Sequence, residues 1–218
     1  MLRLVCGNLN YSSWSVRPWL ALKYSGLDFR IHDVGLKTEE GWKDRILSFS
    51  GAGRVPVLVD GTLSIHESLA ICEYVAELAP AARLWPEDRA LRARGRAIAC
   101  EMHSGFSHLR NSMDMNLRAR THRTPRSPEI DADIARVLDI WQASLGSNGG
   151  PFLLGAFSIA DCMFFPVVTR FRTYGVPLPA FAQEYAAALF ALPFVAELER
   201  IAATTPAIPE YDAALGRA

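Results

Sequence analysis

The sequence predicts an α/β unit followed by an all-α unit, and three observations support this prediction. Short β-rich runs alternate with helical segments up to about residue 79, a stretch with two prolines then breaks the pattern, and no strand signal appears beyond it. We therefore expect an α/β domain over residues 1–79, a linker over 80–88 and an all-helical domain over 89–218.

The first domain is predicted to begin as strand, loop and helix. Residues 2–6 (LRLVC) have the pattern of a short buried strand, and the apolar period over 16–24 predicts a helix that Gly26 ends. Alternation over 27–34 indicates a second strand, and 39–47 indicates a short second helix. This order favours a parallel pairing of the two strands.

A hairpin and a third helix complete the first domain. Gly61 separates two short β-rich runs, VPVLVD and TLSIH, whose spacing is typical of a hairpin. Residues 67–78 then continue with helical periodicity. The predicted order of elements is β-α-β-α-β-β-α.

Helical patterns fill the second domain. Within FSIAD, Ser158 and Asp161 form a capping-box signature before a strongly apolar helix. We expect Asp161 to serve the fold, so that its replacement by alanine costs about 1–2 kcal/mol of stability. Helices are expected at residues 89 to about 117, at 130–145, after 158, at 179–191 and at 193–204.

Composition and charge narrow the possible partners. Lys plus Arg and Asp plus Glu both number 23, so the zero net charge gives no field that would attract nucleic acid or an anionic membrane. The N-terminus has no signal-peptide layout and no apolar run reaches the ~20 residues of a membrane span, so we expect a cytoplasmic protein. The cysteines have no C-x-x-C spacing, which argues against a metal site, a dithiol motif or a disulfide scaffold; they are Cys6, Cys72, Cys100 and Cys162.

The pair Val55–Pro56 is the first local signal of a site. Proline lacks an amide hydrogen, so at the start of a strand it marks a forced turn or a cis peptide bond. A cis bond would leave the backbone amide and carbonyl of Val55 free to pair with an extended peptide ligand. The alternative is that Pro56 only begins an edge strand.

Glu67 and Ser68 lie at the first turn of the third predicted helix. The free amides and positive dipole end of a helix attract a carboxylate, while Glu67 can pair with an ammonium group. Together the two residues suit a zwitterionic ligand. Simple capping of the helix is the alternative explanation.

Three serines, Ser12, Ser13 and Ser15, precede the first predicted helix. No histidine base is nearby and no G-x-S-x-G elbow is present, so a hydrolytic nucleophile is poorly supported. A serine hydroxyl that points at a ligand sulfur, helped by the helix N-terminus, favours the thiolate of a thiol whose free pKa is ~8.5. Lowering that pKa by about two units requires about 2.7 kcal/mol, which a charge-assisted hydrogen bond and a helix dipole can supply. Capping is again the alternative.

Taken together, these segments resemble the cytosolic glutathione transferases over nearly the whole chain. The most specific pieces are GRVPVLVDG followed by HESLAICEYV, and FSIAD resembles the family's helix-capping signature. The N-terminal YSSWSVRPWLAL resembles the serine-type members, in particular the zeta-class pattern Ser-Ser-Cys-Ser, one residue, Arg. The resemblance implies a thioredoxin-like N-terminal domain that binds glutathione and an all-α C-terminal domain that forms the electrophile site.

By this resemblance, Ser12 is the residue expected to stabilise the thiolate, because it precedes Arg17 by the family's spacing of five positions. Ser13 and Ser15 remain alternatives. Trp14 stands where the zeta pattern has cysteine, so we expect general conjugation ahead of maleylacetoacetate isomerisation, the characteristic zeta reaction.

The same resemblance implies the other contacts of glutathione. The backbone of Val55, which precedes Pro56, would pair with the cysteinyl unit, and Glu67 and Ser68 would hold the γ-glutamyl end. Arg54 would reach the glycyl carboxylate, or it is a solvated loop charge.

The first long helix of the second domain is expected to face the glutathione sulfur. Its candidates for the electrophile pocket are Met102, His103, Phe106 and Arg110. The stripe that contains Met102 and Phe106 is also typical of plain core. His103 and Arg110 lie on a neighbouring face, where they would meet an acidic substrate or simply solvent.

The function expected from these residues is addition of the glutathione thiolate to a small electrophile, with detoxification as the role, a homodimer as the assembly and no metal. Two alternatives stay open: glutathione-dependent isomerisation of a maleyl-type substrate, and a non-catalytic glutathione or ligand binder. The zeta resemblance also expects an arginine near Arg170 or Arg172 for a substrate carboxylate.

Overall fold

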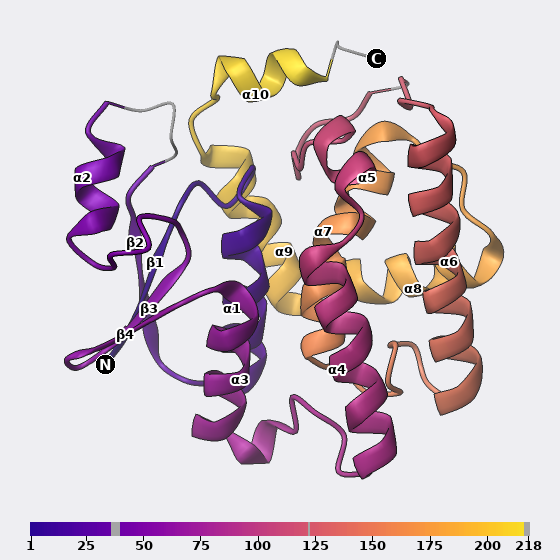
Figure 1. Ribbon diagram of the computed structural model, residues 1–218, viewed down its shortest axis with the longest axis horizontal. Coiled ribbons are helices and arrows are strands. Elements are labelled where there is room, and N and C mark those ends of the chain that lie inside the picture. Colours follow the sequence, from indigo (N-terminus) through magenta and orange to yellow (C-terminus); the bar gives the residue numbers. More distant parts are fainter. Residues whose placement is uncertain (36–39, 122, 216–218) are drawn as a thin grey trace.

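The computed structural model describes residues 1–35, 40–121 and 123–215. Its N-terminal part contains a four-stranded sheet (Figure 1). The strands are β1 (Leu2–Cys6), β2 (Phe29–Asp33), β3 (Val57–Asp60) and β4 (Leu63–His66). They lie in the order β2-β1-β3-β4, with β1 parallel to β2 and both other pairings antiparallel. The predicted parallel pair and the predicted hairpin are both confirmed.

Three helices accompany the sheet: α1 (Ser13–Ser25), α2 (Trp42–Leu47) and α3 (Ser68–Leu78). α1 begins earlier than the apolar period indicates, because Ser12 serves as its N-cap. The predicted start of the second helix, Glu39, lies outside the described residues.

Helices make up the C-terminal part, and the described residues after β4 form no further strand. This arrangement confirms the predicted thioredoxin-like domain followed by an all-α domain. Within the described ranges, no helix combines the length and the apolar character that a membrane span requires. The helices are α4 (Arg89–Ser104), α5 (Ser107–Ser112), α6 (Pro128–Asn148), α7 (Ile159–Tyr174), α8 (Ala180–Phe190), α9 (Pro193–Thr204) and α10 (Pro209–Ala214).

α1 is buried because it lies between the two parts of the molecule. It packs against α3 on one side and against α7 of the helical part on another (Figure 1). A helix that is apolar on more than one face is stable only in such a position. The α1 residues with no exposed surface include Val16, Trp19, Leu20, Ala21 and Leu22.

The prediction of one long helix from residue 89 to about 117 is wrong, because the chain breaks between α4 and α5. Gly105 is extended at the break, and Phe106 has a left-handed φ of 58°. A Cβ on residue 105 would lie 2.7 Å from the carbonyl oxygen of Glu101, so glycine is required there. The apolar periodicity continues across the break, which is why the spacing did not reveal it.

The capping box at the start of α7 is confirmed. The buried carboxylate of Asp161 accepts the backbone N–H and the hydroxyl of Ser158, both at 2.8 Å. It also accepts the N–H of Leu153 and the hydroxyl of Tyr185, both at 3.1 Å. The residue therefore connects three segments of the helical part.

Candidate functional site

A cavity of about 760 Å³ opens between the sheet and the helical part. Its wall combines the loop before α1, the segment before β3, the start of α3, and residues of α4, α5, α7 and α10. Residues from distant parts of the sequence therefore meet in one place. The predicted site residues that lie on this wall are Ser12, Ser13, Arg54, Val55, Pro56, Glu67, His103 and Arg110.

Ser12 and Ser13 lie on the cavity wall at the N-terminus of α1, and each is 7% exposed. Ser13 Oγ accepts a hydrogen bond from Nη2 of Arg170 at 3.4 Å. Ser15 is fully buried and is not one of the residues that line the cavity. Of the three predicted serines, Ser12 and Ser13 are therefore the two that can contact a ligand.

Ser15 supports Ser12 from behind. Its Oγ accepts the N–H of Gly7 at 3.1 Å and the hydroxyl of Ser12 at 2.9 Å. Because hydroxyl hydrogens rotate, the pair also works in reverse, with Ser15 donating to Ser12. In that orientation the hydroxyl of Ser12 is free to donate into the cavity.

Val55 and Pro56 line the cavity, and the peptide bond between them is cis, which is one of the alternatives that the sequence left open. Val55 is not among the residues through which β3 pairs with β1 or β4. Its backbone therefore lies at the cavity and outside the sheet ladder. Arg54 lines the cavity as well, with an exposed side chain.

Glu67 lines the cavity at the N-terminus of α3, with a left-handed φ of 74°. Its side chain makes no capping hydrogen bond, so the structure does not support the simple capping explanation. A non-glycine residue in this conformation is typical of a functional position. Ser68 is fully buried and not on the cavity wall, and its Oγ has no partner among the described residues.

His103, near the end of α4, connects the helical part to the start of α3. Its Nε2 lies 3.4 Å from Oε2 of Glu67. Burial lowers the pKa of His103, the charge of Arg17 lowers it further, and Glu67 opposes both effects. The imidazole is therefore mainly neutral at pH 7.

Trp14 contacts two guanidinium groups. The Arg17 and Arg110 guanidinium carbons lie 4.4 and 4.7 Å from its ring centroid, and the His103 ring meets it edge-on at 5.2 Å. Arg17 is fully buried, and none of its guanidinium nitrogens has a hydrogen-bond partner among the described residues. Burial, together with the charges of Arg110 and Arg170, lowers the pKa of Arg17 to about 9. The side chain still carries its charge at pH 7.

Arg170 is the arginine of α7 that reaches the cavity, and it is 5% exposed. Its guanidinium donates to two backbone carbonyl oxygens at 2.7 and 3.2 Å, which fixes its orientation beside Ser13. Burial lowers the pKa of Arg170 to about 10, so it is charged at pH 7. Arg172 is not on the cavity wall, and its Nη1 pairs with Glu199 at 2.8 Å.

Met102 and Phe106 are not on the cavity wall, which corrects their assignment to the electrophile pocket. Met102 has no exposed surface, Phe106 is 7% exposed, and both belong to the main hydrophobic core. The apolar stripe of α4 is therefore the plain core that its spacing equally suggested. His103, one position along the helix, faces the cavity instead.

Several wall residues escaped the sequence reasoning. Tyr11 precedes Ser12, and Trp14 stands between Ser13 and Ser15, so their position in the motif was an available signal. Asp114 and Met115 follow α5 in a segment that was expected to be helix. Tyr211 lies on α10, a helix that no periodicity indicated.

Two family matches cover most of the chain. Residues 11–78 match the family described as Glutathione S-transferase, N-terminal domain, and residues 118–203 match Glutathione S-transferase, C-terminal domain.

Similar proteins point the same way. A probable maleylacetoacetate isomerase from Caenorhabditis elegans is 30% identical over 76% of this chain and 77% of its own length. Maleylacetoacetate isomerase from Rattus norvegicus is 30% identical over 76% of each chain. A glutathione transferase homolog from Burkholderia gl BGR1, solved with bound glutathione, superposes with a TM-score of 0.71 at 25% identity over 92% of this chain and 97% of the other. The chain therefore belongs to the glutathione S-transferase family.

Proposed function

We propose that the chain is a glutathione transferase that binds glutathione as the thiolate and adds it to a small electrophile. One observation carries the proposal: Ser12 at the N-terminus of α1, Val55 before β3 and Glu67 at the N-terminus of α3 all line the same cavity. The cavity volume of about 760 Å³ is in the range of small-molecule sites.

Glutathione is a tripeptide with an ammonium group, two carboxylates and a thiol. Its extended cysteinyl unit suits the backbone of Val55, in the manner of an added strand. Its γ-glutamyl end suits Glu67, which offers a carboxylate to the ammonium group, and the backbone amides at Ser68, which offer donors to the carboxylate. Arg54, exposed at the cavity, suits the glycyl carboxylate.

The thiolate is proposed to form at Ser12. The thiol proton leaves to solvent, and the hydroxyl of Ser12 turns from Ser15 to donate to the sulfur, while Ser15 donates to Ser12. The N-terminus of α1 and the buried charge of Arg17 favour the anion further. Ser13 only accepts from Arg170, so its hydroxyl can also donate, and it is the alternative donor to the sulfur.

In the chemical step the sulfur lone pair forms a bond to an electrophilic carbon. With an aryl halide, the halide leaves with the electron pair of the carbon–halogen bond; with an activated alkene, a proton from solvent completes the addition. The protein contributes by forming the thiolate and by holding both reactants in one cavity.

A second candidate function is isomerisation of a maleyl-type substrate, and the placement of Arg110 and Arg170 on the cavity wall favours it. Two cations on the wall of one cavity suit a substrate that carries carboxylates. The thiolate would add to the cis double bond and leave an enolate, the new single bond would rotate, and expulsion of the thiolate would restore the double bond in trans.

The proposal is tested by titrating glutathione calorimetrically and by assaying turnover of an aryl halide and of a maleyl-type substrate. We expect binding and turnover, with a loss of about 10- to 100-fold in kcat/KM for Ser12→Ala. Glutathione binding without turnover of any electrophile in a broad panel would instead support a non-catalytic binder. Unchanged turnover in Ser12→Ala near neutral pH would rule out the role of that serine.

A homodimer, a cytoplasmic location and a role in detoxification are parts of the same proposal. Their support is membership of the family together with the composition of the chain. Size-exclusion chromatography with light scattering tests the dimer. We expect a mass of twice 24.1 kDa, the mass of one chain.

A further inference from the structure

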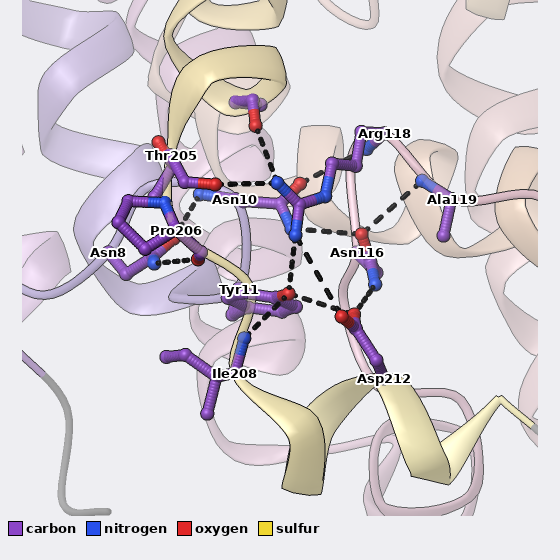
Figure 2. A network of polar contacts seen from close by, with 11 residues as sticks. Asn8, Asn10, Tyr11, Asn116, Arg118, Ala119, Thr205, Pro206, Ile208 and Asp212 are labelled. Carbon is purple, nitrogen blue, oxygen red and sulfur yellow. Dashed lines mark hydrogen bonds and ion pairs between the residues drawn. The ribbon is translucent and has the colours of Figure 1, made fainter. Parts of the chain in front are cut away.

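The C-terminal segment is tied to the loop that carries Ser12 by a polar network (Figure 2). We call residues 205–213 the C-terminal latch. The hydroxyl of Tyr11 donates to Oδ1 of Asp212 at 2.8 Å, and it accepts the N–H of Ile208 at 3.2 Å. Nη2 of Arg118 donates to the same hydroxyl at 2.9 Å. Tyr11, the residue before Ser12, thus connects the loop before α1 to Ile208 and to Asp212 of α10.

Arg118 fastens the latch at a second point. Its Nη1 donates to the carbonyl oxygen of Thr205 at 2.6 Å, and its Nη2 lies 3.8 Å from Oδ2 of Asp212. Asn116 donates to Oδ1 of Asp212 at 2.8 Å and accepts from Asn10 at 2.9 Å. Asn10 in turn accepts the backbone N–H of Arg118 at 3.1 Å. The network in Figure 2 is therefore closed between three segments of the chain.

Tyr211 is the side chain that the latch presents to the cavity. It lines the wall, and its ring centroid lies 5.2 Å from that of Tyr11. Tyr11 and Ile208 are buried, and Tyr211 packs on them in an apolar cluster separate from the main core. The latch therefore adds an aromatic surface to the same cavity that holds Ser12.

We propose that the C-terminal latch forms one wall of the electrophile site, with Tyr211 as a specificity-determining residue. Tyr11, Arg118 and Asp212 act as positioning residues, because their bonds fix the latch relative to the loop of Ser12. The role of Tyr211 rests on the proposed glutathione transferase function, and kinetics test it. The positioning role of the other three residues is tested by hydrogen exchange, which needs no turnover.

The kinetic test compares Tyr211→Ala with Tyr211→Phe, using glutathione with a compact and a bulky aryl halide. For Tyr211→Ala we expect the KM ratio of the two halides to change by about five- to tenfold, with the glutathione Kd and the pH profile of kcat within about twofold of wild type. Tyr211→Phe keeps the ring and is expected to retain the wild-type ratio. An unchanged ratio in Tyr211→Ala would overturn the assignment of Tyr211.

The exchange test compares Tyr11→Phe with Tyr74→Phe. Each variant loses one tyrosine hydroxyl that bonds an aspartate, but the Tyr74 hydroxyl bonds Asp60 at 2.9 Å in the hairpin region, away from the latch. In Tyr11→Phe we expect amide exchange to accelerate together in the latch and in the loop at residues 7–13. In Tyr74→Phe both segments should match the wild type.

The outcomes separate the two proposals. A wild-type chain that neither binds glutathione nor turns over an electrophile would contradict the proposed function, and coupled exchange would then still support the latch. Exchange that accelerates in one segment alone, or in neither, would overturn the positioning role whatever the turnover.

Discussion

Glu67 and His103 are in contact on the wall of the cavity, with 3.4 Å between Oε2 of Glu67 and Nε2 of His103. One residue begins α3 and the other lies in the last turn of α4. The carboxylate that is proposed to hold the ammonium group of glutathione is therefore within reach of a titratable group from the helical part.

This contact predicts a pH dependence of glutathione affinity. Burial and Arg17 lower the pKa of His103 below its ordinary value of 6.5, so the imidazole is neutral at pH 7 and gains a proton only under acidic conditions. Protonated His103 would compete with the ammonium group of glutathione for the carboxylate of Glu67, although the charges of Arg17 and Arg110 disfavour that protonated form. We expect the Kd of glutathione to rise as pH falls below 6.5, and His103→Gln to flatten that rise, as measured by calorimetry across pH. An identical pH profile in His103→Gln would contradict the prediction.

The lowered pKa of His103 also predicts how the free energy of unfolding changes with pH. Because the folded-state pKa of His103 is lowered, the unfolded chain binds the proton more readily in acid. The contribution of this residue to the free energy of unfolding is therefore present above pH 6.5 and is lost as pH falls. Denaturant unfolding of wild type and His103→Gln at several pH values measures the difference.

The three serines are predicted to have unequal effects on turnover. Ser12→Ala removes the donor to sulfur and should cost the most, while Ser15→Ala removes only the partner of Ser12 and should cost about 3- to 10-fold in kcat/KM. Ser13→Ala should change conjugation by less than about threefold, because the sulfur is proposed to accept from Ser12 and the substitution removes only a 3.4 Å contact with Arg170. Steady-state kinetics of the three variants checks the order. A larger loss in Ser13→Ala than in Ser12→Ala would transfer the role to Ser13.

Arg17 is predicted to support function at the expense of stability. It is a buried cation whose guanidinium has no hydrogen-bond partner among the described residues, so Arg17→Met should be neutral or stabilising in denaturant unfolding. Loss of its positive charge should raise the pKa of bound glutathione on the order of one unit. Arg96→Met, which removes an exposed arginine paired with Glu73, is the matched control. A bound-thiol pKa that is unchanged in Arg17→Met would show that Arg17 does not stabilise the thiolate.

Asp161 is predicted to matter for folding alone. Its carboxylate accepts four buried hydrogen bonds, so Asp161→Ala should cost about 3 kcal/mol or more in the free energy of unfolding. This exceeds the capping cost expected from the sequence, because Leu153 and Tyr185 also lose their acceptor. The control is Asp88→Ala at the N-cap of α4, where a single bond to the N–H of Leu91 predicts a loss of about 1 kcal/mol. Equal losses in the two variants would contradict the prediction.

The parts of the fold that the sequence predicted correctly are those that depend on local signals. The strands, the hairpin and the capping box at Asp161 follow from short-range periodicity and turn chemistry, which act within a few residues. The break at Gly105 went unseen, because the demand for glycine there comes from the position of the Glu101 carbonyl and not from the apolar pattern.

The site residues show the same difference between local signals and long-range contacts. Ser12, Val55 and Glu67 are recognisable because each lies at the start of an element, where free backbone groups meet the cavity. Tyr211 was not predictable, because its place on the wall depends on a network that spans 201 positions between Tyr11 and Asp212. Met102 was misassigned because periodicity shows that a helix face is buried without showing what covers it.

The central claim is that the hydroxyl of Ser12 holds bound glutathione as a thiolate, and ultraviolet thiolate absorbance of the complex, titrated against pH, tests it most directly. We expect a bound-thiol pKa about two units below the free value of ~8.5 in the wild type, and a return toward that value in Ser12→Ala. A pKa near ~8.5 in the wild type, or the same depressed pKa in Ser12→Ala, would contradict it.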